Sequence, residues 1–222
     1  SDTSAIITGQ DNQMTLAKMY GVPFDDTETW DKLLNQLTTE EMTRIVTGSA
    51  LSTIPSIAYP AMFMKDGPQG NQLRTYVEDG TSATGFCGEV LRACSFNRDL
   101  MYEVGTAMGE DWYRTETVGA YTPAVNIHRT PYAGRNFEYY SEDGFLSGEL
   151  ATQEVEGLQN HGVICYIKHF ALNDQETNRQ GICTFSNEQA IREIYLKAFE
   201  KPFTEGKVKG SMGAFNRIGC TW

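Results

Sequence analysis

The sequence lacks long apolar runs and has few cysteines and histidines. No run approaches the roughly twenty apolar residues of a membrane-spanning helix, and no signal-peptide pattern is present. The five cysteines are odd in number and show no CxxC spacing, and the three histidines lie far apart in the chain. These absences argue against a disulfide framework and a zinc site. We therefore expect no metal, no cofactor and no membrane partner, and a reducing, cytoplasmic setting.

Basic residues are few relative to acidic ones. The 222-residue chain has 29 acidic and 18 basic residues, which gives a formal net charge of −11. Such a charge repels nucleic acid and anionic membrane surfaces, so we expect no nucleic-acid partner. An apolar content of 40% is enough for a packed core, and we see neither an internal repeat nor a low-complexity tract. These features indicate a globular chain the size of one α/β domain.

The first part of the chain differs from the rest in its pattern. Residues 1–28 have no clear periodicity, so we expect a lead-in or linker there, followed by one folded domain over residues 29–222. Thr38 and Glu41 form a capping box for a helix through Val46. A preceding helix is indicated by apolar residues that share one face, namely Trp30, Leu33, Leu34 and Leu37.

Strands and helices alternate from about residue 57 onward. Asn97 can cap one helix, and Ser186 with Gln189 forms a second capping box. Apolar spacing predicts a further helix around Val155, ending near Gly162. We predict strands over residues 57–64, 121–127, 163–167 and 208–215. This alternation calls for a parallel α/β fold with right-handed crossovers.

The segment KHFALNDQETNR at 168–179 follows the apolar run at 163–167. Polar residues at the carboxyl end of a buried parallel strand are where α/β barrels place their chemistry. The alternative is a loop of solvated polar residues. Neighbouring side chains on a regular strand point to opposite faces. Lys168 and His169 can therefore reach one ligand only if a bulge or a non-proline cis peptide lies between Lys168 and Phe170.

Three further segments accompany this one. They are KDGPQG at 65–70, GRNFEYYSEDGFLSGE at 134–149 and GSMGAFNRIG at 210–219. In this order the four segments resemble glycoside hydrolase family 3, in its β-glucosidase-like branch, from about Trp30 to the end of the chain. The resemblance implies a (β/α)8 TIM-type barrel. Because such a barrel typically needs about 250 residues, we expect an incomplete barrel of about six strand–helix units.

The resemblance also implies which residues hold the sugar. Sugar hydroxyls both donate and accept hydrogen bonds, and charged side chains in a partly dry pocket suit them. The matching positions are Asp66, Arg135, Lys168, His169 and Arg179. For Asp66 the alternative role is an Asx turn before Pro68. For the arginines it is an ion pair with Glu138, Glu142 or Glu176, and an arginine can make both contacts.

Two positions depart from the family pattern. Arg74 stands eight residues after Asp66, where the family spacing is six, so the loop must bulge if this arginine is to reach the sugar. Phe215 stands where the family usually has a tyrosine that steadies the nucleophile. A phenyl ring keeps a stacking surface and loses the hydroxyl donor. Four other aromatic residues could form a sugar platform, although core packing is favoured for them: Phe137, Tyr139, Tyr140 and Phe145.

Membership of this family would make the chain part of a retaining β-glycosidase that acts on a small neutral saccharide or β-glycoside. The resemblance places the nucleophilic Asp and the acid/base Glu outside these 222 residues. We therefore expect no catalytic residue in this chain, and we expect the remainder of the polypeptide or a second chain to complete the barrel. The alternative is a non-catalytic carbohydrate-binding or scaffold protein of the same fold. A phosphate-binding barrel is disfavoured because no glycine-rich phosphate loop is present.

Overall fold

The computed structural model describes residues 6–49, 52–72 and 82–221. The chain forms two compact units, residues 1–63 and residues 64–222. The division predicted from the sequence, between residues 28 and 29, falls inside the first unit. We describe each unit by itself.

The first unit is helical. It contains the 3-10 helix η1 (Leu16–Met19), α1 (Thr27–Leu34), α2 (Thr39–Arg44), the π-helical turn η2 (Ile45–Ser49) and η3 (Pro55–Ile57). The predicted capping box of α2 is present, with the Thr38 side chain accepting from the Glu41 backbone and the Glu41 carboxylate accepting from Thr38. Gln36 joins separate segments, because its side-chain amide donates to the carbonyls of Met14 and Ser56. The core contains Met19, Leu33, Leu37, Ile54 and Ile57.

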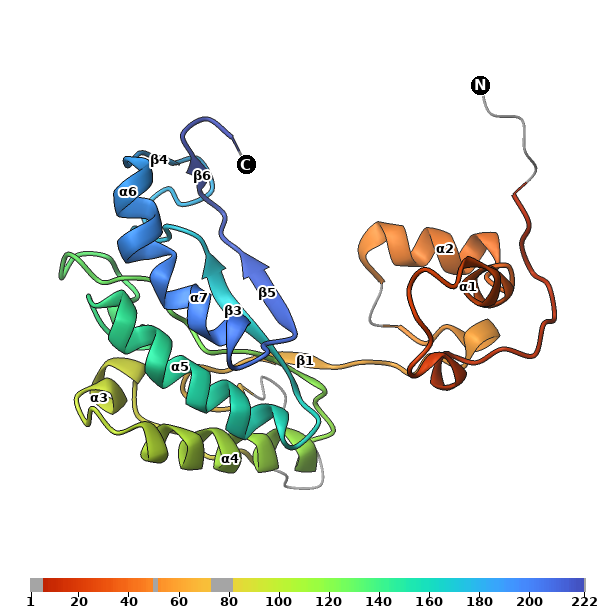
Figure 1. Cartoon of the computed structure of the whole chain (residues 1–222), viewed down its shortest axis with the longest axis horizontal. Coiled ribbons are helices and arrows are strands. Elements are labelled where there is room, and N and C mark those ends of the chain that lie inside the picture. The colour runs from red at the N-terminus through yellow and green to blue at the C-terminus, as the bar shows by residue number, and fades with distance from the viewer. Residues whose placement is uncertain (1–5, 50–51, 73–81, 222) are drawn as a thin grey trace. The chain divides into compact units, whose positions relative to one another are not determined.

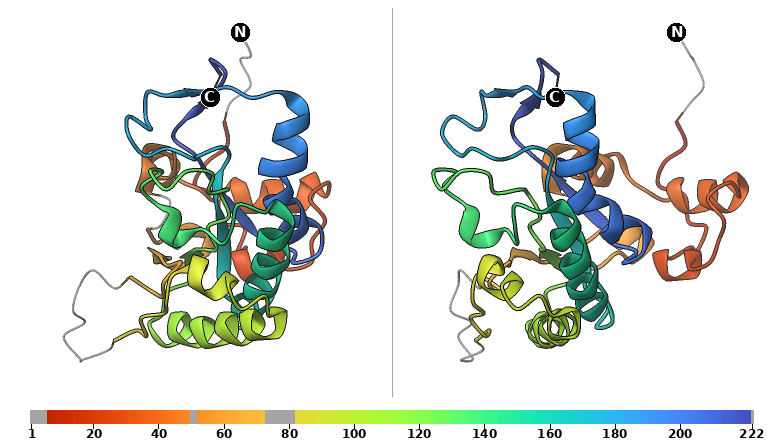
Figure 2. Two further views of the ribbon diagram at one scale, coloured as in Figure 1. Left: turned by 90° about the vertical axis from the view of Figure 1, so that its left-hand side faces the viewer. Right: turned by 60° about the vertical axis from the view of Figure 1, so that its left-hand side comes forward.

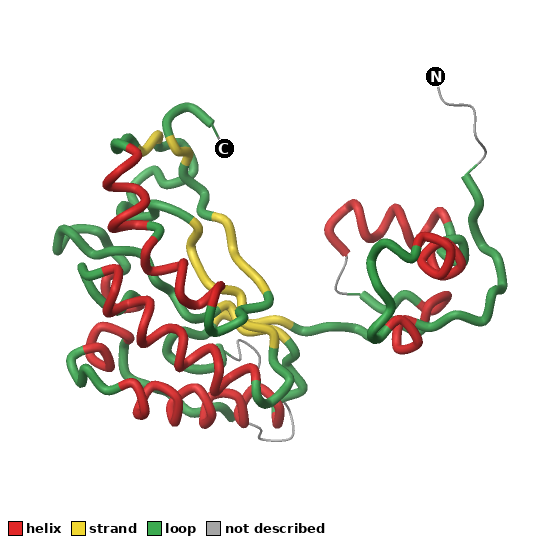
Figure 3. Tube along the Cα trace, viewed as in Figure 1, coloured by secondary structure: helices red, strands yellow, loops and turns green. Residues whose placement is uncertain are grey.

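The second unit is built on a parallel sheet. Its strands are β1 (Met64–Asp66), β2 (Gly119–Tyr121), β3 (Ile164–Phe170) and β5 (Gly210–Gly213), which lie side by side in chain order. A separate two-stranded parallel pair is formed by β4 (Cys183–Thr184) and β6 (Arg217–Ile218). Figures 1 and 3 show the helices of this unit gathered along the sheet. Parallel neighbours in chain order are the arrangement of a (β/α)8 barrel.

Helices connect the strands and supply one side of the core. They are α3 (Glu89–Ala93), α4 (Arg98–Arg114), the 3-10 turn η4 (Asn136–Glu138), α5 (Gly144–Gln159), α6 (Glu188–Ala190), the π-helical turn η5 (Ile191–Tyr195) and α7 (Lys197–Thr204). Figure 2 shows α4, α5 and α7 from two further directions. Gly105 lets the backbones of α4 and α5 approach closely, since a Cβ there would lie 2.3 Å from the Glu154 carbonyl oxygen. Apolar side chains of these helices, among them Trp112, Val155 and Phe199, share one core cluster with Ala120 of β2 and Ile167 of β3.

The observed strands are shorter than the apolar runs predicted. The strand expected over 57–64 is β1 at 64–66, and residues 55–57 belong to a 3-10 helix of the first unit. The strand expected over 121–127 pairs only at 119–121, with an isolated bridge at Ala124. Pro123 lacks the N–H that a continuous ladder requires. Across residues 64–72 and 82–221 the main sheet has four strands, one near each of the four apolar runs predicted as strands and fewer than the about six strand–helix units expected.

Helix ends were predicted with mixed success. Asn97 caps α4 through the backbone N–H of Leu100, as predicted. The capping box at Ser186 and Gln189 is wrong. The cap is Asn187, whose side-chain oxygen accepts from Ala190, because an asparagine one position later satisfies the free N–H groups of the helix start. In the part of the chain that the structure describes, no helix has the length and apolar character needed to cross a membrane.

Candidate functional site

A cavity of about 580 Å³ opens at the carboxyl ends of the parallel strands. β1 contributes Asp66, β3 contributes Lys168 and His169, and the loops after β2 and β3 contribute other charged groups. Polar side chains at this edge of a barrel are where catalytic and binding residues concentrate. The charged side chains and the imidazole that line it are those of Asp66, Arg135, Glu138, Lys168, His169 and Arg179.

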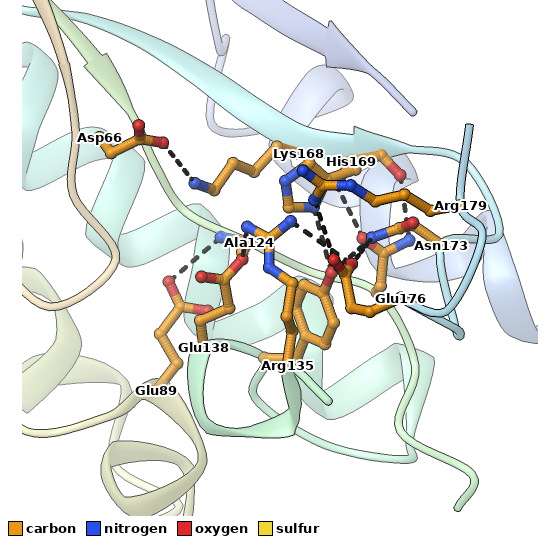
Figure 4. A network of polar contacts seen from close by, with 12 residues as sticks. Asp66, Glu89, Ala124, Arg135, Glu138, Lys168, His169, Asn173, Glu176 and Arg179 are labelled. Atoms are coloured by element: carbon orange, nitrogen blue, oxygen red, sulfur yellow. Dashed lines mark hydrogen bonds and ion pairs between the residues drawn. The ribbon is translucent and has the colours of Figure 1, made fainter. Parts of the chain in front are cut away.

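Asp66 and Lys168 form an ion pair in the wall of this cavity. The Lys168 Nζ lies 3.1 Å from Asp66 Oδ1, although 102 residues separate them in sequence. The Lys168 side chain is 1% exposed and that of Asp66 is 39% exposed. Figure 4 shows the lysine ammonium directed at the carboxylate. Asp66 therefore neutralises the buried cation and still has carboxylate surface to offer to a ligand.

The loop after β1 sets the position of Asp66. The backbone N–H of Gln72 donates to the Asp66 carbonyl oxygen at 3.0 Å and closes the loop. Gly67 lies directly on the buried ring of Trp112, where an added Cβ would come within 2.2 Å of a ring carbon. The buried guanidinium of Arg92 donates to the Pro68 carbonyl at 2.5 Å. The close approach of Trp112 explains the glycine at position 67, and the two backbone contacts hold the loop on either side of it.

The backbone at Lys168 and His169 is irregular, as predicted. The Lys168–His169 peptide bond is cis, and the pairing of β3 with β5 shifts register between Ile167 and Phe170. Asn126 holds this segment on its other side. Its Oδ1 accepts from the His169 N–H at 2.8 Å, and its Nδ2 donates to the His169 carbonyl at 3.0 Å. Both Lys168 and His169 line the same cavity.

His169 is buried and neutral. Its Nδ1 lies 3.1 Å from the hydroxyl of Tyr139, which also accepts a bond from Asn173 Nδ2 at 3.0 Å. Burial, and after it the positive charges of Arg135, Lys168 and Arg179, together lower the pKa of His169 to about 2. Each of these effects disfavours a second proton on the ring. At physiological pH His169 therefore acts as a hydrogen-bonding group, without a charge of its own.

Two arginines share one carboxylate beside the cavity. Glu176 Oε2 accepts from Arg179 Nη1 at 2.9 Å, and Glu176 Oε1 lies 3.5 Å from Arg135 Nη1. Arg135 also pairs with Glu138, a buried carboxyl whose pKa is raised by its burial. Glu138 and Glu176 are two of the three ion-pair partners proposed for the arginines from the sequence. A carboxylate that anchors part of a guanidinium leaves its other N–H groups oriented for a ligand.

Phe215 lies over Arg179. The guanidinium carbon of Arg179 is 4.8 Å from the centre of the Phe215 ring, a cation–π contact. The ring is about half exposed and lines the cavity. Its stacking surface is therefore partly used by Arg179.

A buried polar network supports the backbone next to the site, and it was not predicted from the sequence. Arg92 Nη1 donates to Glu154 at 2.7 Å, and its Nη2 lies 3.6 Å from Glu89. Glu89 in turn accepts from the backbone N–H of Ala124 at 3.1 Å. Burial, and then the charge of Glu154, raise the pKa of Glu89 well above its ordinary value. The network thus links the loop after β1 with the segment that follows β2.

The predicted site residues have these outcomes. Asp66, Arg135, Lys168, His169, Arg179 and Phe215 line one cavity, as the resemblance implied, and Arg74 lies outside the described residues. Tyr139 and Tyr140 are buried, in agreement with core packing, whereas Phe137 and Phe145 are more than half exposed. Asn126 and Asn173 were not singled out. An asparagine that bonds backbone or a neighbouring side chain has no distinctive sequence pattern.

No described part of the chain is arranged to hold a metal ion, since no group of three or more His, Cys, Asp or Glu side chains converges there. The cavity instead presents three cationic side chains, three acidic side chains in or beside it, and one neutral imidazole: Lys168, Arg135 and Arg179, then Asp66, Glu138 and Glu176, then His169. Charges balanced in this way suit a neutral polar ligand better than a strongly charged one.

Comparisons with known proteins agree with this geometry. Beta-glucosidase A of Butyrivibrio fibrisolvens is 42% identical over 181 residues, which are 78% of this chain and 22% of that protein. The structure of beta-glucosidase 3B from Thermotoga neapolitana in complex with alpha-D-glucose matches with a TM-score of 0.74 and 43% identity, over 77% of this chain and 24% of that one. A beta-glucosidase from Paenibacillus barengoltzii matches 97% of this chain and 24% of its own, with a TM-score of 0.80 and 29% identity.

The chain thus spans about a quarter of the length of these relatives. A family model, the glycosyl hydrolase family 3 N terminal domain, matches residues 28–219. This chain belongs to glycosyl hydrolase family 3.

Proposed function

We propose that this chain supplies the sugar-binding part of the active site of a retaining β-glucosidase, which hydrolyses terminal β-linked sugars. The observation that carries the proposal is the convergence of Asp66, Lys168, His169 and Arg135 on one cavity. Relatives with 42% and 43% identity are beta-glucosidases, and the Thermotoga neapolitana structure contains glucose. A bound sugar ring in this chain would lie against the same strand ends.

Acidic and basic side chains of the cavity would make opposite kinds of hydrogen bond to a sugar. Asp66 offers carboxylate oxygens, which accept bonds from sugar hydroxyls, while Lys168 and Arg135 offer donors. Hydrogen bonds that involve one charged partner contribute about 1.5–3 kcal/mol each, so two or three of them determine whether a terminal sugar binds. Because Lys168 and Asp66 already neutralise each other, binding a neutral hydroxyl group creates no uncompensated buried charge.

The chemistry requires two further carboxyl groups. In a retaining glycosidase one carboxylate forms a glycosyl-enzyme and the other acts as acid and then base, with the two about 5–5.5 Å apart. The family resemblance assigns both groups to residues outside this chain. In the proposed enzyme the residues of this chain orient the sugar so that its anomeric carbon faces that pair.

The test compares two Asp→Asn substitutions in the polypeptide that contains this chain. Asp66→Asn removes the carboxylate charge and one acceptor, and kcat/KM for an aryl β-glucoside should fall by about 10- to 100-fold, because each 1.4 kcal/mol is tenfold. Asp25→Asn changes the same group at an exposed position of the first unit and should leave kcat/KM unchanged.

Equal activities of the two variants would contradict the assignment of Asp66. Saturable glucose binding without turnover by the intact polypeptide would favour the non-catalytic carbohydrate-binding alternative instead.

A further inference from the structure

A chain of hydrogen bonds runs from Glu176 through Asn173 and Tyr139 to His169. A carboxylate between two guanidinium groups accepts hydrogen bonds and donates none. Glu176 Oε1 lies 3.0 Å from the side-chain amide of Asn173, so the atom of Asn173 that faces it is the Nδ2 donor. Turning the amide over would place Oδ1 against the carboxylate and lose this bond. The orientation of Asn173 is therefore set by Glu176, even though its Oδ1 is buried without a hydrogen-bond partner.

The next step is the hydroxyl of Tyr139. Asn173 Nδ2 directs a hydrogen to this hydroxyl at 3.0 Å, so the Tyr139 oxygen accepts. Burial raises the pKa of Tyr139, and the phenol keeps its own proton. That proton is directed to His169 Nδ1, 3.1 Å away, with the two rings edge to face at 84°. Figure 4 shows Glu176, Asn173 and His169 in this sequence.

We infer that Asn173 and Tyr139 are positioning residues that hold His169 as the Nε2–H tautomer. Nδ1 is occupied as an acceptor, and a neutral imidazole has only one proton, which then resides on Nε2. No described residue makes a hydrogen bond to Nε2, and the ring lines the cavity. His169 therefore presents a donor to whatever enters.

If the ligand is a sugar, as the proposed function holds, this tautomer determines which sugar hydroxyls accept and which donate hydrogen bonds in the cavity. A sugar hydroxyl that meets Nε2–H must act as the acceptor, whereas a hydroxyl that meets Asp66 must act as the donor. The cavity thus specifies the direction of hydrogen bonds as well as their positions. An acceptor-only group, such as fluorine, is tolerated opposite His169 and is rejected opposite Asp66.

The tautomer itself can be measured without any sugar. The polypeptide that contains this chain, labelled with 15N in histidine, gives ring nitrogen resonances whose positions separate protonated from unprotonated nitrogen, and the resonances lost in His169→Gln identify this residue. We expect a protonated Nε2 and an unprotonated, hydrogen-bonded Nδ1. A proton on Nδ1, or on both nitrogens, at neutral pH would overturn the inference whether or not the protein is a glucosidase.

Two variants separate positioning from a merely structural role. Tyr139→Phe removes the donor to Nδ1 and keeps the ring, so the Nδ1 resonance should move to that of a nitrogen without a hydrogen bond. Tyr140→Phe is the matched control. It removes the neighbouring buried hydroxyl, which bonds Glu154 at 2.5 Å, and should leave the His169 resonances unchanged. Identical His169 spectra in wild type and Tyr139→Phe would contradict the assigned bond.

Fluorinated sugars test the consequence for the ligand. We expect one ring position at which a fluoro-glucose inhibits about 3- to 10-fold better than the corresponding deoxy-glucose, and we expect this ratio to approach one in Tyr139→Phe. If the ratio survives unchanged in Tyr139→Phe, the hydroxyl of Tyr139 does not set the donor on His169. If wild type shows no such position while the NMR result holds, the tautomer stands and its proposed role toward a sugar is wrong.

Discussion

At the scale of single residues, Lys168 combines complete burial with the ligand-binding role that we propose for it. A buried charge is costly to desolvate, and replacing a buried ion pair by apolar groups is often neutral or stabilising. Its partner Asp66 is 39% exposed and can be solvated without it. The lysine is therefore better explained by the ligand than by the stability of the fold.

Lys168→Met tests this explanation. We expect the melting temperature to stay equal or rise, because a cation is no longer buried, while KM rises at least tenfold, because a charged donor is lost. Lys32→Met is the control. It removes a lysine from an exposed ion pair with Glu28 and should alter neither quantity appreciably. A large loss of stability in Lys168→Met with KM unchanged would show that the lysine serves the fold.

His169 leads to a prediction about pH. The pKa of His169 is about 2 in the folded protein, whereas the ordinary pKa of a histidine is 6.5. Between these two pH values the unfolded chain binds a proton at this residue that the folded chain does not. Stability should therefore fall as pH drops below 6.5, by up to about 1.4 kcal/mol per pH unit from this residue. Denaturant unfolding between pH 7 and 4 should show a shallower loss in His169→Gln than in wild type. Parallel curves for the two proteins would contradict the lowered pKa.

At the scale of secondary-structure elements, the sequence indicated the order of strands and helices but not their lengths. Apolar runs at 57–64 and 121–127 do not distinguish a strand from an extended segment next to one, since both bury apolar side chains. The positions of Asp66 and Lys168 were predictable because each follows an apolar run in the sequence and belongs to a segment that matches a family motif. The contacts of Asn126 and Glu89 with backbone groups could not be predicted, because they depend on three-dimensional approach between segments far apart in the chain.

Arg92 shows how these elements are held together. It lies between Glu89 of α3, Glu154 of α5 and the Pro68 carbonyl, and its side chain is 3% exposed. Removing one member of a buried ionic network leaves uncompensated charge and typically costs about 3–5 kcal/mol.

We therefore expect Arg92→Met to lower the free energy of unfolding by about 3–5 kcal/mol and to weaken sugar binding, because the loop that carries Asp66 loses its support. Arg114→Met, which breaks an exposed pair with Glu110, should cost less than about 1 kcal/mol. Chemical denaturation of both variants measures the difference. A similar small cost for both would mean that the buried network contributes little.

At the scale of the whole molecule, the described sheet is one part of a barrel. β1 and β5 form its two ends, and unpaired strand edges invite association with another strand. We propose that the remainder of the polypeptide, or a second chain, covers these edges. The family match over residues 28–219 and the relatives' greater length support this arrangement.

Residues 1–222 alone should have no glycosidase activity, because the resemblance assigns both carboxyl groups of the reaction to residues outside them. Aryl β-glucosides assayed with the pure 222-residue chain, and with the longer polypeptide as a positive control, give the comparison. Turnover by the pure chain would show that a carboxylate pair within these residues performs the reaction.

The central claim is that the cavity between Asp66, Lys168 and His169 holds a sugar ring. A crystal structure of the polypeptide that contains this chain, determined after soaking in glucose, tests it most directly. We predict density for one pyranose ring, with hydroxyls within about 3.2 Å of an Asp66 oxygen, of Lys168 Nζ and of His169 Nε2. A glucose bound elsewhere, with this cavity left to water at saturating glucose, would contradict the account.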